Sequence, residues 1–176
     1  MRNRNTHTTL WIWATIVVTL SAVTVSSVTD VQAEEEVAAR VVYHNQKVEM
    51  VEVGDVPGHF VGITDQPGLM FVTKGNASGD VAVRKGTTYF DSVKGKGTST
   101  GYVVYTFKDG SNKSYRATGT FSPTEGGGLT FEGTYEMTGG TGRFAGMKGK
   151  GTYKGERIGS QQTGQYYFDS RGAEWK

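Results

Sequence analysis

The sequence of 176 residues contains no cysteine. It therefore offers no disulfide, no thiol nucleophile and no thiolate metal ligand, so the fold depends on its core and its hydrogen bonds. Proline is scarce, with 3 residues against 26 glycines. A large excess of one charge is also missing, because 19 Lys and Arg stand against 17 Asp and Glu. This balance does not favour binding to nucleic acid or to an anionic membrane surface.

Long charge-free runs are missing except near the N-terminus. There, Arg2 and Arg4 precede an apolar or small stretch at 10–28, and Val31-Gln32-Ala33 follows it. This order is typical of a secretory signal peptide, here residues 1–33. A retained membrane anchor is the alternative, because the run is about long enough to span a bilayer. We predict cleavage after Ala33 and one exported domain at 34–176, periplasmic or extracellular, without stable membrane insertion after cleavage.

What the domain does contain is alternation of apolar and polar residues. At 129–138, for example, Leu129, Phe131, Gly133, Tyr135 and Met137 alternate with polar residues. A period of two is typical of a half-buried strand. Similar patterns predict further strands at 41–53 (broken near Asn45), 59–63, 69–73, 81–93, 97–107, 114–122, 147–155 and 163–169. A turn at Asp65-Gln66-Pro67-Gly68 would separate the second and third of these.

This set of strands predicts an all-β fold. About eight antiparallel strands in one open sheet would leave its edges exposed, whereas closure removes the edges. We therefore expect an eight-stranded antiparallel up-and-down β-barrel of the calycin-like kind, with a two-sheet sandwich as the alternative. Glycines recur before threonine at 86, 119, 133 and 151. Glycines inside strands permit the tight coiling that a small barrel requires.

The glycine-rich stretch 137–155 does not match a nucleotide-binding loop. Gly140, Gly142 and Gly146 miss the G-x-G-x-x-G spacing, and an alternating segment follows where a helix is needed. Gly149-Lys150 is followed by glycine where a P-loop needs Ser or Thr. We therefore predict no cofactor. Instead, residues 139–146 would connect two strands through a helical turn at 143–145, with Phe144 closing one end of the core.

Residues 138–146 read Thr-Gly-Gly-Thr-Gly-Arg-Phe-Ala-Gly, and a Gly-x-Gly-x-Tyr strand follows them. This element, together with residues 102–119, resembles the allene oxide cyclase and dirigent-protein barrel superfamily, in particular its bacterial barrel-like proteins of unassigned activity. The resemblance covers residues 48–155. It implies an eight-stranded barrel whose cavity binds apolar, often oxygenated small molecules. Proteins of the dirigent type often trimerise, so the resemblance also allows a homo-oligomer.

Two groups of residues are candidates for function. Glu52 and His59 could act as acid and base at the rim of the barrel. Alternatively, they are ordinary turn and strand residues. His44 and His59 lack a third ligand at a suitable spacing, so no metal site is predicted. The candidate ligand-binding residues, which could equally be core aromatics, are Tyr89, Tyr105, Tyr115, Tyr135 and Phe131.

Two strand arginines could hold a carboxylate if their side chains pointed inward. They are Arg84 and Arg116, and the alternation places Arg116 outward. Three functions stay open from the sequence. The first is an exported barrel that binds a small apolar ligand in its lumen, and the second is a cofactor-free isomerase or cyclase. The third is a structural or interaction barrel with a filled core, which an open cavity would distinguish from the other two.

Overall fold

The computed structural model describes residues 33–160 and 164–176. Nearly all of the predicted signal peptide lies outside the described residues. In the part of the chain that is described, no helix is long and apolar enough to cross a membrane. The elements in chain order are β1 (Glu35–His44), β2 (Lys47–Glu52), β3 (His59–Lys74), β4 (Val81–Val93), β5 (Lys96–Phe107), β6 (Asn112–Pro123), β7 (Leu129–Gly140), the 3-10 turn η1 (Gly142–Phe144), β8 (Lys148–Ile158) and β9 (Gln165–Trp175).

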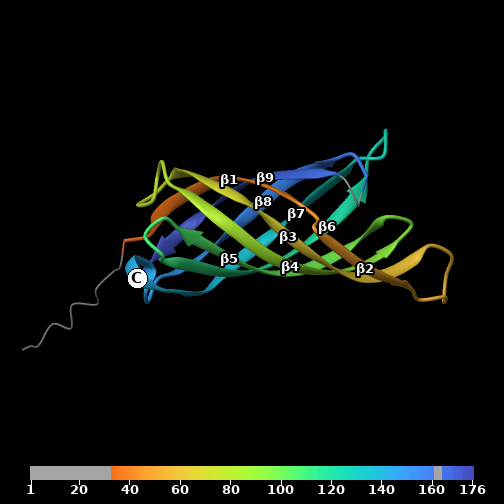
Figure 1. Ribbon diagram of the computed structural model, residues 1–176, viewed down its shortest axis with the longest axis horizontal. Helices are drawn as coiled ribbons and strands as arrows, with labels where there is room; N and C mark the ends of the chain where they lie inside the picture. Colours follow the sequence, from red (N-terminus) through yellow and green to blue (C-terminus); the bar gives the residue numbers. More distant parts are fainter. Residues whose placement is uncertain (1–32, 161–163) are drawn as a thin grey trace, which may run out of the picture. The chain divides into compact units, whose positions relative to one another are not determined.

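Eight of these strands close into one barrel (Figure 1). Their hydrogen-bonded order is β1-β9-β8-β7-β6-β5-β4-β3-β2, and β1 also pairs with β3. This additional pairing joins the two sides of the sheet and leaves β2 outside the ring. All neighbouring strands are antiparallel. The predicted eight-stranded barrel is therefore confirmed, and one continuous closed sheet replaces the alternative of two packed sheets.

The break predicted near Asn45 is present between β1 and β2. Asn45 and Gln46 belong to neither strand, and the Gln46 N–H donates to the Asp65 carbonyl at 2.8 Å. Beyond the break, β2 pairs with the first half of β3, whereas β1 pairs with the second half. The break at Asn45 thus carries the chain out of the ring, from β1 to β2.

The turn predicted at residues 65–68 is wrong. β3 runs through these residues without interruption and pairs with β4 along its length, for example at Pro67 opposite Lys85. On its other side β3 changes partner here, from β2 up to Asp65 to β1 from Gly68 onward. Proline has no N–H to donate, so it fits a place where the ladder is interrupted. The turn-like residues therefore mark a change of partner within one long strand.

Gly68 also permits the closure of the ring. It lies opposite Tyr43 of β1. A Cβ at Gly68 would lie 2.2 Å from the Val42 carbonyl oxygen and 2.6 Å from the Tyr43 Cβ. No side chain fits at that separation, so a residue without one allows β1 and β3 to approach closely.

The last strand extends beyond its predicted end at Asp169. β9 continues to Trp175 because both of its neighbours continue with it: Ser170 pairs with Ala39 of β1, and Glu174 pairs with Gly149 of β8. The alternation of apolar residues gave no sign of this extension. The inward positions of this segment are serine, glycine and glutamate instead of apolar residues.

Two pairs of glycines make room for tyrosine rings inside the barrel. A Cβ at Gly119 or Gly133 would lie 2.4 or 2.7 Å from the hydroxyl oxygen of Tyr153. A Cβ at Gly151 or Gly172 would lie 2.5 Å from the hydroxyl oxygen of Tyr135. The recurrent glycines thus do more than permit curvature, because they also provide the surface over which large inward side chains lie.

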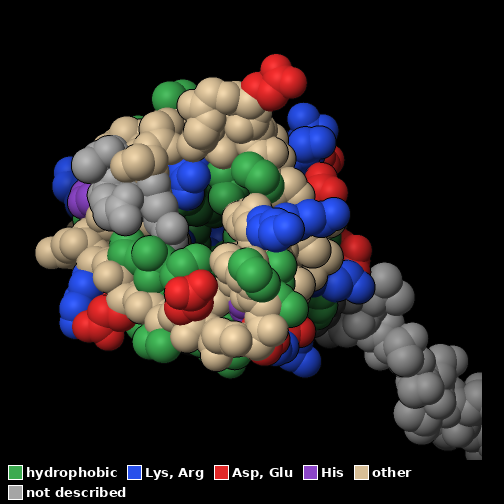
Figure 2. Space-filling model, turned by 90° about the vertical axis from the view of Figure 1, so that its right-hand side faces the viewer, with side chains coloured by type: hydrophobic (Ala, Val, Ile, Leu, Met, Phe, Trp, Pro, Cys, Tyr) green, Lys and Arg blue, Asp and Glu red, His purple; other side chains and the backbone are tan. Residues whose placement is uncertain are grey.

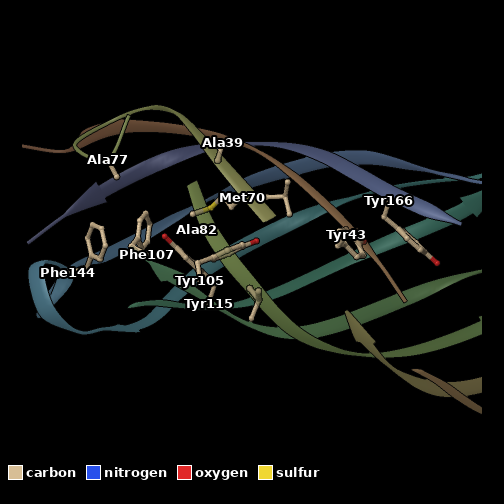
Figure 3. Packing of buried hydrophobic residues seen from close by; sticks show 12 residues of the cluster. Ala39, Tyr43, Met70, Ala77, Ala82, Tyr105, Phe107, Tyr115, Phe144 and Tyr166 are labelled. Atoms are coloured by element: carbon tan, nitrogen blue, oxygen red, sulfur yellow. The ribbon is translucent and has the colours of Figure 1, made fainter. Parts of the chain in front are cut away.

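One end of the barrel is closed by η1. Phe144 is 2% exposed, and its ring packs on Phe107 with centroids 4.7 Å apart. Figure 3 shows these two rings beside Ala77 at one end of the buried cluster. Arg143 lies over the Phe144 ring at 4.7 Å and forms ion pairs with Asp80 and Asp109. The predicted helical turn and the closing role of Phe144 are confirmed.

Candidate functional site

The lumen of the barrel contains a cavity of about 280 Å³. Phe144 and Ala77 lie at its closed end (Figure 3). Figure 2 views the opposite end, where the β2–β3 and β6–β7 connections lie, and shows a hollow with hydrophobic side chains in its wall. Inward residues of β1, β3 and β4 line one side, and inward residues of β5 to β9 line the rest. The cavity is therefore a cup enclosed by the sheet itself.

Aromatic rings form much of the wall. Tyr43 of β1 stacks on Tyr166 of β9, with ring centroids 4.7 Å apart. Tyr115 of β6 meets Tyr105 and Tyr135 edge to face, at 5.9 and 5.5 Å. Burial raises the pKa of Tyr135 to about 12, with a smaller contribution from the nearby charge of Glu174. At neutral pH this hydroxyl is therefore protonated and can donate a hydrogen bond to a ligand.

Arg84 lies inside the barrel on β4 and is 6% exposed. Its guanidinium donates to the backbone carbonyl of Gln66 and, at 3.1 Å, to the Gln66 side-chain oxygen. The same group lies over the ring of Tyr43 at 4.3 Å. Thr88 also donates to the Gln66 side-chain oxygen, at 2.9 Å. A cation is thus held in the lumen by neutral oxygen atoms and an aromatic face.

A buried ion pair lies nearer the closed end. Lys113 Nζ and Glu174 Oε2 are 2.5 Å apart, with side chains 7% and 3% exposed. The Tyr115 hydroxyl donates to Glu174 Oε1 at 2.7 Å. Burial, together with the negative charge of Glu174, raises the pKa of Tyr115 above its ordinary value. Three ionisable groups therefore converge at one place in the lumen, with the charge of Glu174 matched by Lys113.

Most of the predicted ligand-binding residues lie in the cavity wall. Tyr105, Tyr115, Tyr135 and Phe131 all line it. Tyr89 does not, because it occupies an outward position of β4 and is 49% exposed. Apolar residues occupy both faces of β4, so the sequence pattern did not reveal which face points inward.

The predicted acid–base pair lies elsewhere. Glu52 is exposed on β2, outside the ring, and neither Glu52 nor His59 lines the cavity. His59 bonds through its two ring nitrogens to Asp55, at 2.6 Å, and to Asp91, at 3.0 Å. These carboxylates, Asp55 first, raise the pKa of His59 against the opposing effect of burial. The catalytic role of Glu52 and His59 stays a prediction, and the structure gives it no place in the lumen.

Sequence reasoning did not find Lys113 and Glu174, and it gave Arg84 only a conditional role. Lys113 occupies an inward position at the start of β6, before the first residue of the predicted strand. Glu174 lies beyond the predicted end of the last strand. Had the alternation been extended at both ends, it would have placed both residues on the inner face.

No family model matches the chain, and no curated protein matches it. Among solved structures, the conserved protein of unknown function RPA1785 from Rhodopseudomonas palustris matches with a TM-score of 0.54 and 10% identity, over 80% of this chain and 98% of that chain. Two pterocarpan synthase dirigent proteins also match over 82% of this chain. GePTS1 has a TM-score of 0.47, 18% identity and 93% coverage of its own chain. PsPTS1 has a TM-score of 0.46, 17% identity and 97% coverage of its own chain.

The likeness to the Rhodopseudomonas palustris protein shows a shared fold at low sequence identity. The fold of this chain is the closed antiparallel barrel that the sequence predicted.

Proposed function

We propose that this chain is an exported barrel that binds a small apolar or oxygenated molecule in its lumen. The observation that carries the proposal is the cavity of about 280 Å³. A barrel whose own side chains filled its core would leave no such space. At about 30 Å³ for each non-hydrogen atom, the share of a water molecule in the liquid, the cavity holds a ligand of roughly nine such atoms.

The wall suits a ligand with an apolar body and some oxygen atoms. Aromatic rings supply flat apolar surface, and the tyrosine hydroxyls supply hydrogen-bond donors at fixed points. The pKa of Tyr135 is raised to about 12, so its hydroxyl is a neutral donor near pH 7, whereas the Tyr115 hydroxyl already donates to Glu174. Export is the other half of the proposal and depends on the signal-like segment that ends at Ala33.

Calorimetric titration with 1-octanol, a neutral probe of suitable size, tests the proposal. We expect one site per chain and a negative heat-capacity change, which accompanies burial of apolar surface. Ala117→Phe adds a ring to the cavity wall beside Gly101 and Tyr135, its cross-strand neighbours. This variant should weaken octanol binding by at least about tenfold, equivalent to about 1.4 kcal/mol.

The matched control is Thr120→Phe, which adds the same ring to an exposed position of the same strand. It should bind octanol as the wild type does. Octanol binding to Ala117→Phe with wild-type affinity would contradict a site in the lumen.

A second candidate function is a cofactor-free isomerase or cyclase. The convergence of Tyr115, Glu174 and Lys113 in the lumen favours it, because proton transfer needs ionisable groups within reach of one ligand position. An enzyme of this kind, incubated in D2O with the molecule that co-purifies with it, should exchange a carbon-bound proton of that molecule. The exchange should vanish in Glu174→Gln. Absence of exchange with the wild type would leave only the binding function.

A further inference from the structure

The side chain of Arg84 is a buried cation without a carboxylate partner among the described residues. It is 6% exposed, and it hydrogen-bonds to the backbone and side-chain oxygens of Gln66 and to the Tyr105 hydroxyl, all of which are neutral. Its Nε is buried and has no hydrogen-bond acceptor in the described part of the chain. Arginine cannot lose its proton in a protein, so the charge persists inside the barrel. Buried charges are normally paired, and the residues that the structure describes provide no counter-charge for this one.

The guanidinium is fixed in position by its surroundings. One face lies 4.3 Å from the ring centroid of Tyr43. A Cβ at Gly86 would lie 2.7 to 2.8 Å from the guanidinium atoms, so this glycine makes room for the group. Gln66 is itself held, because its side-chain amide donates to Asn45 at 3.3 Å and its oxygen accepts from Thr88. A side chain restrained in this way loses little conformational freedom when it binds a partner.

The charges around the cavity leave a positive excess. Among the described residues, its lining includes Lys74, Arg84, Lys113, Arg157 and, as the one acidic residue, Glu174. Lys113 is paired with Glu174, and Lys74 is paired with Glu36 at 2.5 Å. Arg157 donates to the carbonyls of Gly159 and Gly127, in two connections beside the cavity, and forms no ion pair among the described residues. Two cations, Arg84 and Arg157, therefore face the space without a matching anion in the described part of the chain.

We infer that the ligand of the lumen is a small monocarboxylate whose head group pairs with Arg84, an inference that rests on the proposed function of the lumen as a binding site. The planar fork of a guanidinium matches the geometry of a carboxylate. A guanidinium has five N–H donors, which is more than Gln66 and Tyr105 accept, so Arg84 keeps a donor for this contact in the cavity wall. The aromatic wall then receives the apolar body of the ligand. With a cavity of about 280 Å³, this body is a short chain or a single ring.

Octanoate and 1-octanol test the inference in the wild type without any substitution. The two probes share a chain, and the alcohol is the less strongly hydrated, so an apolar site without a cation would favour octanol. We expect the opposite order, with octanoate binding about tenfold more tightly or better. In Arg84→Met, octanoate should bind about 10- to 100-fold more weakly, as expected for loss of a charged hydrogen bond, while octanol keeps its affinity.

Arg116→Met is the control, because Arg116 is a strand arginine that is exposed on the outer face of β6. It should bind both probes as the wild type does. Arg84→Met without ligand should also melt at a higher temperature than the wild type, because it removes an uncompensated buried charge. Octanol binding as tight as octanoate binding in the wild type overturns the inference and leaves the proposed binding function intact. Failure of both probes to bind the wild type overturns both proposals.

Discussion

His59 is a titratable residue whose ring lies between two carboxylates, with its side chain 16% exposed. Its Nδ1 lies 2.6 Å from Asp55, and its Nε2 lies 3.0 Å from Asp91. Both carboxylates favour the protonated ring, so the pKa of His59 is raised, and the hydrogen bond to His59 lowers the pKa of Asp55. The protonated ring thus connects the β2–β3 connection, which holds Asp55, to β4, which holds Asp91. This linkage is lost when the ring loses its charge.

Thermal unfolding of the wild type and of His59→Gln across pH checks this contribution. A raised folded pKa gives stability that is fully present below the unfolded value of about 6.5 and is lost as the pH rises through the folded pKa. Asp55 has a lowered pKa, so its contribution is lost only when the pH falls through that value, below about 4. The difference in melting temperature should be largest near pH 5 to 6 and should decline at alkaline pH. A difference that stays constant from pH 5 to pH 9 would contradict the linkage.

Individual site residues were predictable where the strand pattern was clear. Tyr115, Tyr135 and Phe131 lie on strands whose apolar residues occupy one face, and all three line the cavity. Tyr89 and Arg84 lie on β4, where valines occupy the outer face and an arginine occupies the inner one. On such a strand local hydrophobicity does not identify the inner face, because pairing across the whole ring fixes the register.

At the scale of the strand, the recurrent glycines are explained by the rings that lie over them. Tyr153 lies across Gly119 and Gly133, which are opposite each other on β6 and β7. Tyr135 lies across Gly151 and Gly172, which are opposite each other on β8 and β9. Each tyrosine therefore covers a pair of neighbouring glycines. This packing places the tyrosine side chains in the wall of the cavity.

Gly133→Val tests this packing. A Cβ at Gly133 would lie 2.1 Å from the Thr118 carbonyl oxygen and 2.7 Å from the Tyr153 hydroxyl oxygen, so the side chain has no room. We expect the free energy of unfolding in urea to fall by about 1–3 kcal/mol, as for other overpacked sites. Thr134→Val, at the next and outward position of β7, should change it by no more than about 0.5 kcal/mol. Equal stability of Gly133→Val and the wild type would show that the glycine is not required.

The sequence predicted the bounds of a strand well where apolar alternation defined the strand, and poorly where pairing with neighbouring strands defined it. Alternation predicted β4 to β8 closely, and Phe144 was correctly placed at the closed end. The uninterrupted β3 was missed because its partner change at Pro67 has the same local residues as a turn. The full length of β9 was missed because backbone pairing with β1 and β8, instead of apolar side chains, carries the strand to Trp175.

At the scale of the whole barrel, closure produces the candidate site. The pairing of β1 with β3 gives each strand of the ring two neighbours, so the inner faces enclose one space. Phe144 closes one end of that space, and the hollow in Figure 2 lies at the other. Residues of a single chain enclose the lumen. The homo-oligomer allowed by the resemblance stays a prediction.

Native mass spectrometry of the protein purified from its natural host tests most directly whether the lumen holds a ligand. We expect an additional mass of a small molecule on the wild-type chain. It should be released on denaturation, carry a carboxylate when it is identified, and be absent from Ala117→Phe. A wild-type protein that carries no additional mass, or the same additional mass on Ala117→Phe, would contradict a ligand held in the lumen.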